Sequence, residues 1–127
     1  VLMPWSFQAD TPIYTQLVAR LQEQIVSGAY PPGSKLPSVR DLAADAGVNP
    51  NTVQRAFAEL ERLGLIYTQR TSGKFVTEDA AAIDAARRAL AEGQTRQYLA
   101  AMSALGFDRA ALITFLNQME ETKDANS

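Results

Sequence analysis

The sequence contains no histidine and no cysteine. Their absence removes the commonest general base, the thiolate nucleophile and the usual ligands of zinc, copper and iron–sulfur clusters. Catalysis would have to rest on carboxylates, lysine, tyrosine or serine, yet neither a Gly-rich phosphate loop nor a convincing carboxylate pair is present. We therefore expect that the chain is not an enzyme and that it holds no metal and no cofactor.

Long apolar runs are also absent. No stretch of the 127 residues reaches the roughly 18 apolar positions that a membrane span needs, and no secretory signal pattern begins the chain. The lack of cysteine fits a reducing compartment. We expect a cytoplasmic protein without a membrane partner, built as one domain or as a small domain with an appendage.

Net charge is low, at −2, but it is unevenly distributed. Residues 35–77 carry six basic and four acidic side chains, a net +2, whereas residues 78–127 carry five basic and eight acidic ones, a net −3. This asymmetry permits a local basic face without requiring one.

The first half of the chain reads as three helices. An apolar stripe with four-residue spacing runs from Ile13 to Ile25 and stops at Gly28. Turn residues follow, with room for a very short strand at Lys35-Leu36. Residues 38–47 and about 50–63 then form two short helices, each opened by a capping side chain and joined through a Gly-containing turn. This is a helix-turn-helix arrangement.

Two β-prone runs, "LIYTQR" and "KFV", come directly after the third helix and are separated by "TSG". Such a pair predicts a hairpin, and a hairpin in this position is a wing. We also expect Trp5 and Phe7 to hold the N-terminal arm against the domain.

The outer face of the third helix carries an unusual set of side chains. On a helical wheel, Asn51, Arg55 and Ala58 lie opposite the apolar stripe, with Gln54 on their flank. Amides pair with adenine and guanidinium with guanine in the major groove, and the N-terminal turns of a recognition helix do the reading. Any surface helix has a polar face, but the capped helix and wing beside this one favour DNA recognition.

Two further segments have a DNA-binding and a plainer interpretation. Arg40 lies in the first turn of its helix, where it can clamp a phosphate, or it can be a solvated partner of Asp41 or Asp45. The wing at residues 70–75 can enter a minor groove or contact phosphates, or it can be a solvated turn.

The segments "PPGSKLPSVRDLA", "VNPNTVQRAF" and "LERLGLI", with the Gly73-Lys74-Phe75-Val76 wing, resemble the winged-helix domain of the GntR family of bacterial transcription regulators. The short tail is similar to that of the YtrA-type subfamily. The resemblance covers about 65 residues and implies that a homodimer binds double-stranded operator DNA, most often as a repressor. Base preference cannot be carried over, because Pro50 and Asn51 stand where better-studied relatives have more Arg and Thr. The predicted DNA-binding residues are Ser38, Arg40, Asn49, Pro50, Asn51, Thr52, Gln54, Arg55, Arg70, Thr71, Ser72, Gly73 and Lys74.

We divide the chain into a winged helix-turn-helix domain at residues 10–77 and a short helical tail at residues 78–127. The tail is predicted to form three helices, at about 79–92, 95–105 and 108–122, separated by Gly93 and Gly106. It is too small to enclose a ligand pocket of roughly 300 Å³, although an effector bound between the tail and the winged helix, or between protomers, stays open. Its apolar residues predict a homodimer interface, and the alternative is that they pack against the chain's own winged helix. The predicted interface residues are Tyr98, Leu99, Met102, Leu105, Leu112, Phe115, Leu116 and Met119.

The predicted fold is thus mainly α with a small β-wing: an N-terminal winged helix-turn-helix and an all-helical C-terminal dimerisation tail. The predicted function is a sequence-specific transcriptional regulator, a repressor that binds a pseudo-palindromic operator. The alternative is a winged-helix module that contacts proteins and lacks specific DNA binding.

Overall fold

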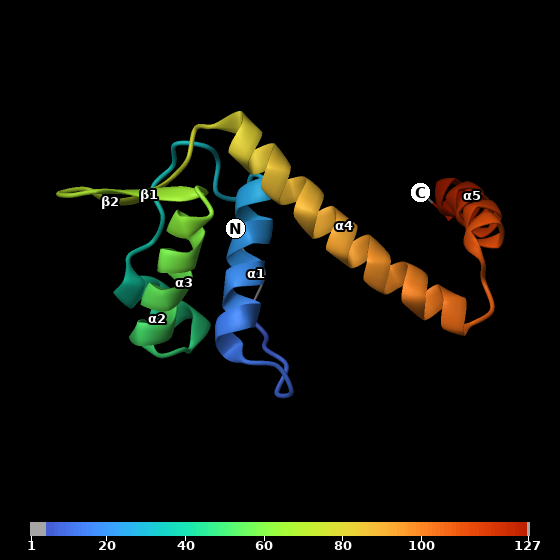
Figure 1. The fold of residues 1–127 in the computed structure, drawn as a ribbon, viewed down its shortest axis with the longest axis horizontal. Helices are drawn as coiled ribbons and strands as arrows, with labels where there is room; N and C mark the ends of the chain where they lie inside the picture. Colours follow the sequence, from blue (N-terminus) through green and yellow to red (C-terminus); the bar gives the residue numbers. More distant parts are fainter. Residues whose placement is uncertain (1–4, 127) are drawn as a thin grey trace. The chain divides into compact units, whose positions relative to one another are not determined.

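The computed structural model describes residues 5–126, with side chains described as far as Met119. The chain forms two compact units, the first ending at Arg88 and the second beginning at Ala89. Figure 1 shows the elements in chain order: α1 (Ile13–Val26), α2 (Val39–Ala46), α3 (Pro50–Arg62), β1 (Ile66–Gln69), β2 (Gly73–Val76), α4 (Ala80–Ala104) and α5 (Arg109–Asn126).

Helices α2 and α3 begin and end at the residues that the sequence predicts. The Ser38 Oγ accepts a hydrogen bond from the Asp41 backbone N–H at 3.0 Å, and the Asn49 Oδ1 accepts one from the Asn51 N–H at 2.8 Å. Pro50 occupies the first helical position of α3, where its missing N–H costs nothing. Gly47 ends α2 in the left-handed conformation, with φ 72°.

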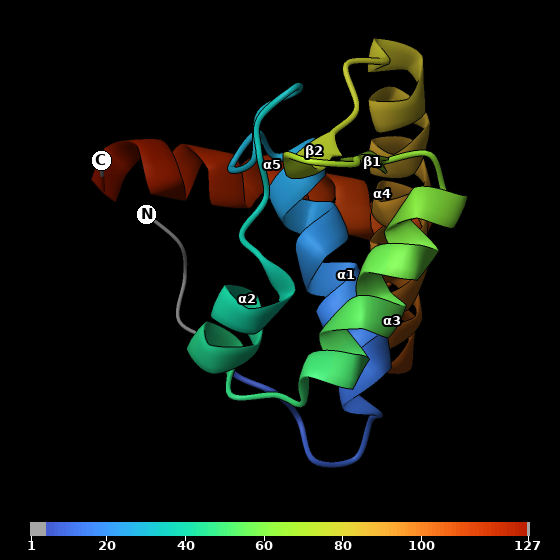
Figure 2. The ribbon, with the colours of Figure 1, turned by 90° about the vertical axis from the view of Figure 1, so that its left-hand side faces the viewer.

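The core of the first unit lies where the three short helices meet. Helix α3 packs against both α1 and α2, and Figure 2 shows the wing strands lying across one end of α1 and α3. Each element contributes its apolar stripe, so the periodicity of the sequence explains the packing. The fully buried side chains include Leu17, Leu21, Ile25, Leu42, Val53, Phe57, Leu60, Leu65 and Val76.

The wing is an antiparallel hairpin. Ile66 pairs with Val76 and Gln69 with Gly73 at the two ends of the register. The very short strand predicted at Lys35-Leu36 is present as a single bridge between Lys35 and Phe75. The segment before α2 is therefore joined to the outer side of β2.

The N-terminal arm is attached to the helices. The Trp5 ring stacks on Phe7, with 5.8 Å between ring centroids, and both pack against the core. The Trp5 Nε1 donates a hydrogen bond to the Asp45 carboxylate at 3.0 Å, and the Arg20 guanidinium lies over the indole at 5.4 Å. The two aromatics hold the arm against the domain, as the sequence predicts, and the arm connects α1 with the end of α2.

The start of α4 belongs to the first unit. Ile83 is buried and Ala86 packs against the same core. The Arg87 Nη2 donates a hydrogen bond to the Val26 carbonyl at the end of α1, at 2.8 Å. These contacts lie beyond residue 77, where the sequence analysis places the end of the winged helix.

The tail contains two helices, so the predicted division into three is wrong. Helix α4 continues through Gly93. One glycine in a helix interior costs only about 1 kcal/mol relative to alanine, and the alanine-rich sequence around Gly93 offsets that cost. Gly106 does separate helices, with φ 94°, and the Asp108 side chain caps α5 by accepting from the Ala111 N–H at 2.8 Å.

Among the described side chains of the second unit, Leu112 of α5 is buried and several other apolar residues remain in contact with water. Leu112 is 4% exposed, and the Phe107 and Phe115 rings lie 5.2 Å apart. Leu105 is 71% exposed, and the other strongly exposed members of the predicted interface are Tyr98, Leu116 and Met119. In the described part of the chain no single helix has the length and apolarity of a membrane span, although α4 and Arg109–Met119 reach that composition when taken together across their bend.

Candidate nucleic-acid interface

The outward face of α3 carries the side chains predicted to read DNA. Asn51, Gln54 and Arg55 are exposed, and so is Ala58 in the following turn. The opposite face of the helix is buried in the core. In the described part of the chain, no hydrogen bond engages the Asn51 or Gln54 carboxamide. These amides are therefore available to a partner outside the chain.

Arg55 is held from beneath by an aromatic side chain of α1. Its guanidinium lies over the Tyr14 ring, with Cζ 4.3 Å from the ring centroid, a cation–π contact. Arg55 as a whole nevertheless stays exposed. Tyr14, at the start of α1, thus limits the orientations that Arg55 adopts on the outer face of α3.

The remaining cation of α3 is occupied. Arg62 donates two hydrogen bonds to the Glu59 carboxylate, with Nη2 2.6 Å from Oε2 and Nε 2.9 Å from Oε1. The pair lowers the pKa of Glu59 and raises that of Arg62, in both cases chiefly through this hydrogen bonding. Arg55 is therefore the cation of α3 that is free of a carboxylate within the described residues.

The first turn of α2 presents Arg40. Its side chain is exposed, and among the described residues it forms no ion pair with Asp41 or Asp45, the plainer interpretation in the sequence analysis. Asp45 instead accepts the Trp5 indole N–H. Ser38 and Asn49 each use one lone pair of a side-chain oxygen as a helix cap, so the Ser38 hydroxyl hydrogen and the Asn49 amide NH2 group are left to donate to DNA.

The wing tip is exposed from Arg70 to Gly73. Gly73 has φ 114°, a conformation that residues with a side chain rarely adopt. A Cβ at this position would lie 3.1 Å from the Lys35 Cε. Lys35 thus packs its methylene chain against the wing, a neighbour that the sequence analysis did not include in the site.

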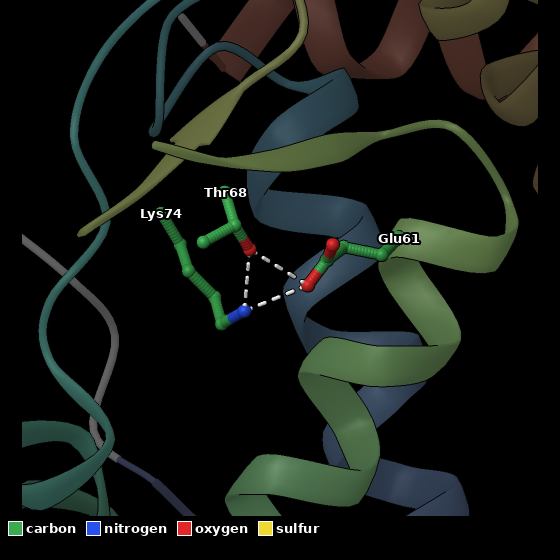
Figure 3. A network of polar contacts seen from close by, with 3 residues as sticks. All are labelled: Glu61, Thr68 and Lys74. Atoms are coloured by element: carbon green, nitrogen blue, oxygen red, sulfur yellow. Dashed lines mark hydrogen bonds and ion pairs between the residues drawn. The ribbon is translucent and has the colours of Figure 1, made fainter. Parts of the chain in front are cut away.

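Lys74 is engaged inside the protein. Figure 3 shows its Nζ between two side chains, donating to the Glu61 Oε1 at 2.7 Å and to the Thr68 Oγ1 at 2.7 Å, while Thr68 also donates to Glu61 at 3.1 Å. The hydrogen bond from Lys74 lowers the pKa of Glu61. The predicted role of Lys74 in DNA binding stays a prediction, and it now competes with this internal role.

A hollow of about 500 Å³ lies between the wing and the start of α2. It brings together Ser38 and the predicted wing residues, together with Lys35 and Phe57; its other lining residues are Leu36, Pro37, Val39 and Asp41. Arg40, Asn51, Gln54 and Arg55 do not line it. The predicted residues therefore form two groups, one on the outer face of α3 and one around this hollow.

One of the residues beside these groups could have been found from the sequence: Lys35 is the cation of the predicted short strand. The predicted loop Thr71-Ser72-Gly73 would put Arg70 opposite Lys74, whereas the loop in the structure is Arg70-Thr71-Ser72 and Thr68 pairs with Lys74. Which face of the wing meets α3, and therefore the role of Glu61, is decided by tertiary packing that no local pattern contains.

A capped pair of short helices, a glycine turn and a hairpin that follows the second helix define a winged helix-turn-helix protein. The family described as "Bacterial regulatory proteins, gntR family" matches residues 13–76. The chain belongs to this GntR family of transcriptional regulators.

Relatives and solved structures support this assignment over different lengths. The HTH-type transcriptional regulator YhcF of Bacillus subtilis is 35% identical over 115 residues, covering 91% of this chain and 95% of that protein. The HTH-type transcriptional repressor YtrA of the same organism is 47% identical over 73 residues, covering 58% and 56%. A GntR family transcriptional regulator from Listeria monocytogenes has a TM-score of 0.80 and 41% identity, covering 88% of this chain and 98% of that one.

A structure of the AraR DNA-binding domain in complex with operator ORX1 is also similar, with a TM-score of 0.51, 27% identity and coverage of 60% and 93%. That domain is therefore seen on DNA with a related fold.

Proposed function

We propose that the chain is a sequence-specific transcriptional regulator, a repressor that binds a pseudo-palindromic operator as a homodimer. Helix α3 lies in the major groove, and the wing at residues 70–75 contacts the minor groove or the backbone. The observation that carries this proposal is the exposed outer face of α3, which places Asn51, Gln54 and Arg55 side by side over a buried apolar stripe.

The chemistry of this face suits base edges. A carboxamide can donate to and accept from adenine at once, and a guanidinium can donate twice to guanine. Gln54 and Arg55 follow Asn51 by three and four residues, so both are neighbours of Asn51 on the helix surface, with Gln54 on the flank. The small exposed side chain of Ala58 lets the middle of the helix approach the groove closely.

The other predicted residues surround this reading face. Arg40, at the start of α2, supplies a phosphate contact that fixes the orientation of the domain without reading sequence. Asn49, Pro50 and Thr52 place the N-terminus of α3, where backbone N–H groups favour a phosphate. The tip residues from Arg70 to Gly73 carry a cation, hydroxyl groups and a glycine that permits close approach to DNA.

The tail provides the surface that binds the second copy of the chain. Leu105, Leu116 and Met119 leave apolar surface exposed in the second unit, and a two-fold dimer would bury it. Two winged helices related by a two-fold axis fit two half-sites one helical turn or a multiple apart. The name of the YtrA relative, a transcriptional repressor, supports repression, and operator DNA places this function in the bacterial cytoplasm.

The experiment that tests the proposal is selection of bound duplexes from a randomised pool by the full chain, followed by binding at several salt concentrations. We expect a two-fold symmetric sequence and an affinity that falls steeply with salt, because neutralised phosphates release counterions. A protein-contact module would recover no motif. Gln54→Ala should relax the base preference at one position in each half-site; an unchanged preference would refute the placement of α3.

A further inference from the structure

Two lysines lie beside the wing, in opposite electrostatic surroundings. Lys74 is on β2, and Lys35 is on the segment that bridges to the same strand through Phe75. Both line the hollow between the wing and α2. Only Lys74 was predicted to contact DNA. Whether each ammonium group already has partners inside the protein decides which of the two lysines can bind a phosphate.

The Lys74 ammonium is already neutralised. It is 2.7 Å from one carboxylate oxygen of Glu61 and 2.7 Å from the Thr68 hydroxyl, and Thr68 donates to the same carboxylate. Glu61 is on α3, whereas Thr68 and Lys74 face each other across the hairpin. The three side chains (Figure 3) therefore connect the proposed reading helix to both strands of the wing.

Lys35 has no comparable partner. Its side chain is exposed and forms no ion pair within the described residues. Its Cε would lie 3.1 Å from a Cβ at position 73, so its methylenes run against the Gly73 backbone at the wing tip. Lys35 thus lines the same hollow as Arg70 and Ser72.

We propose that Lys35 supplies the contact between the wing and the DNA backbone, and that Lys74 is a positioning residue that holds the wing to α3 through Glu61 and Thr68. The inference rests on the proposed function. A phosphate that recruited Lys74 would have to break two hydrogen bonds and leave the Glu61 carboxylate facing a polyanion. Lys35 loses no ion pair when it meets a phosphate.

Salt dependence distinguishes the two lysines. The probe is a duplex of about three helical turns recovered by selection with the full chain, with a shuffled duplex of equal length as reference. Lys35→Gln should reduce the magnitude of the slope of log K against log salt by about 1.8, because each of the two protomers loses one phosphate contact worth about 0.9. Its affinity loss should shrink about twelvefold between 50 and 200 mM salt and should be equal on both duplexes. Lys74→Gln should leave the slope unchanged and weaken the selected duplex more than the shuffled one.

A charge reversal tests the positioning role. Lys74→Glu alone should reduce the preference for the selected duplex, and adding Glu61→Lys should restore it because the pair is rebuilt with its signs exchanged. Lys74→Arg should keep the preference. Two results would overturn the inference. One is a salt slope that changes as much in Lys74→Gln as in Lys35→Gln. The other is a failure of Glu61→Lys to restore the preference for the selected duplex in Lys74→Glu.

Failure of the proposed function would appear differently. In that case the wild-type chain would show no difference between the two duplexes at any salt concentration. The internal contact is decided separately, by amide hydrogen exchange on the DNA-free chain: Glu61→Gln should speed exchange in the wing as much as Lys74→Gln, and the double variant should add little. Additive effects, or none, would overturn the positioning role.

Discussion

Arg55→Ala separates recognition from folding. Arg55 is exposed, and its one contact of note is with the Tyr14 ring at 4.3 Å, so the variant loses about 0.5–1 kcal/mol of cation–π attraction. Alanine is a slightly better helix former. The free energy of unfolding should therefore fall by less than about 1 kcal/mol. A lost bidentate contact to guanine, by contrast, removes about 1–3 kcal/mol of base discrimination, which is about 5- to 150-fold.

The assay is binding to a series of operator duplexes in which each base pair is replaced in turn. We expect the wild-type chain to reject replacement of one guanine in each half-site and Arg55→Ala to accept it, with other positions unchanged. Arg62→Ala is the matched control, because this arginine lies on the same helix but is paired with Glu59. If both variants lower affinity alike at every position, Arg55 reads no base. An unfolding free energy reduced by more than about 2 kcal/mol would show that its role is structural.

Three other predictions concern stability. Gly73→Ala should lower the free energy of unfolding in urea by about 1–2 kcal/mol, because a side chain is strained at φ 114° and meets Lys35; no change would contradict the strain. Gly93→Ala should raise it by about 1 kcal/mol in the same assay, since α4 is helical there and nothing lies within 4 Å of the new Cβ; a loss would show that the glycine is needed. The third variant is Glu61→Gln, because the Lys74 hydrogen bond lowers the pKa of the wild-type carboxyl. The ionised Glu61 therefore contributes to the free energy of unfolding above the ordinary pKa of glutamate, about 4.3. This contribution is lost as pH falls through the lower pKa of the folded state. Thermal unfolding should show wild type and variant converging below that pH, and a constant gap would contradict the assignment.

The local structure of the first unit was largely predictable. Side-chain oxygens at Ser38 and Asn49 begin their helices, Pro50 follows one of them, and Gly47 ends the other. These are signals between residues at most four positions apart, so sequence contains them directly. Gly93 shows the limit of such signals. Whether a glycine ends a helix depends on the helix propensity of the residues around it, and here the alanine-rich segment keeps α4 helical through Gly93.

The candidate site was only half predictable. The outer face of α3 follows from helical periodicity, and the structure leaves it exposed as expected. Lys74 was assigned by residue type and position alone, yet its partner Glu61 is 13 residues away in the chain, and the ring beneath Arg55 belongs to the still more distant Tyr14 of α1. Such pairings depend on how the wing and α1 pack against α3. The sequence therefore identified most of the basic residues around the interface, but neither Lys35 nor the internal partners of Lys74 and Arg55.

The N-terminal arm extends the packed domain beyond the residues that match the family. The family match begins at residue 13, whereas Trp5 grips Asp45 only a few residues ahead of the helix proposed to read DNA. Truncation to residue 13 would remove this hydrogen bond, and a bulky fusion at the N-terminus would disturb it. A truncated form should therefore keep Trp5 and Phe7 if the contact with the end of α2 is to be retained.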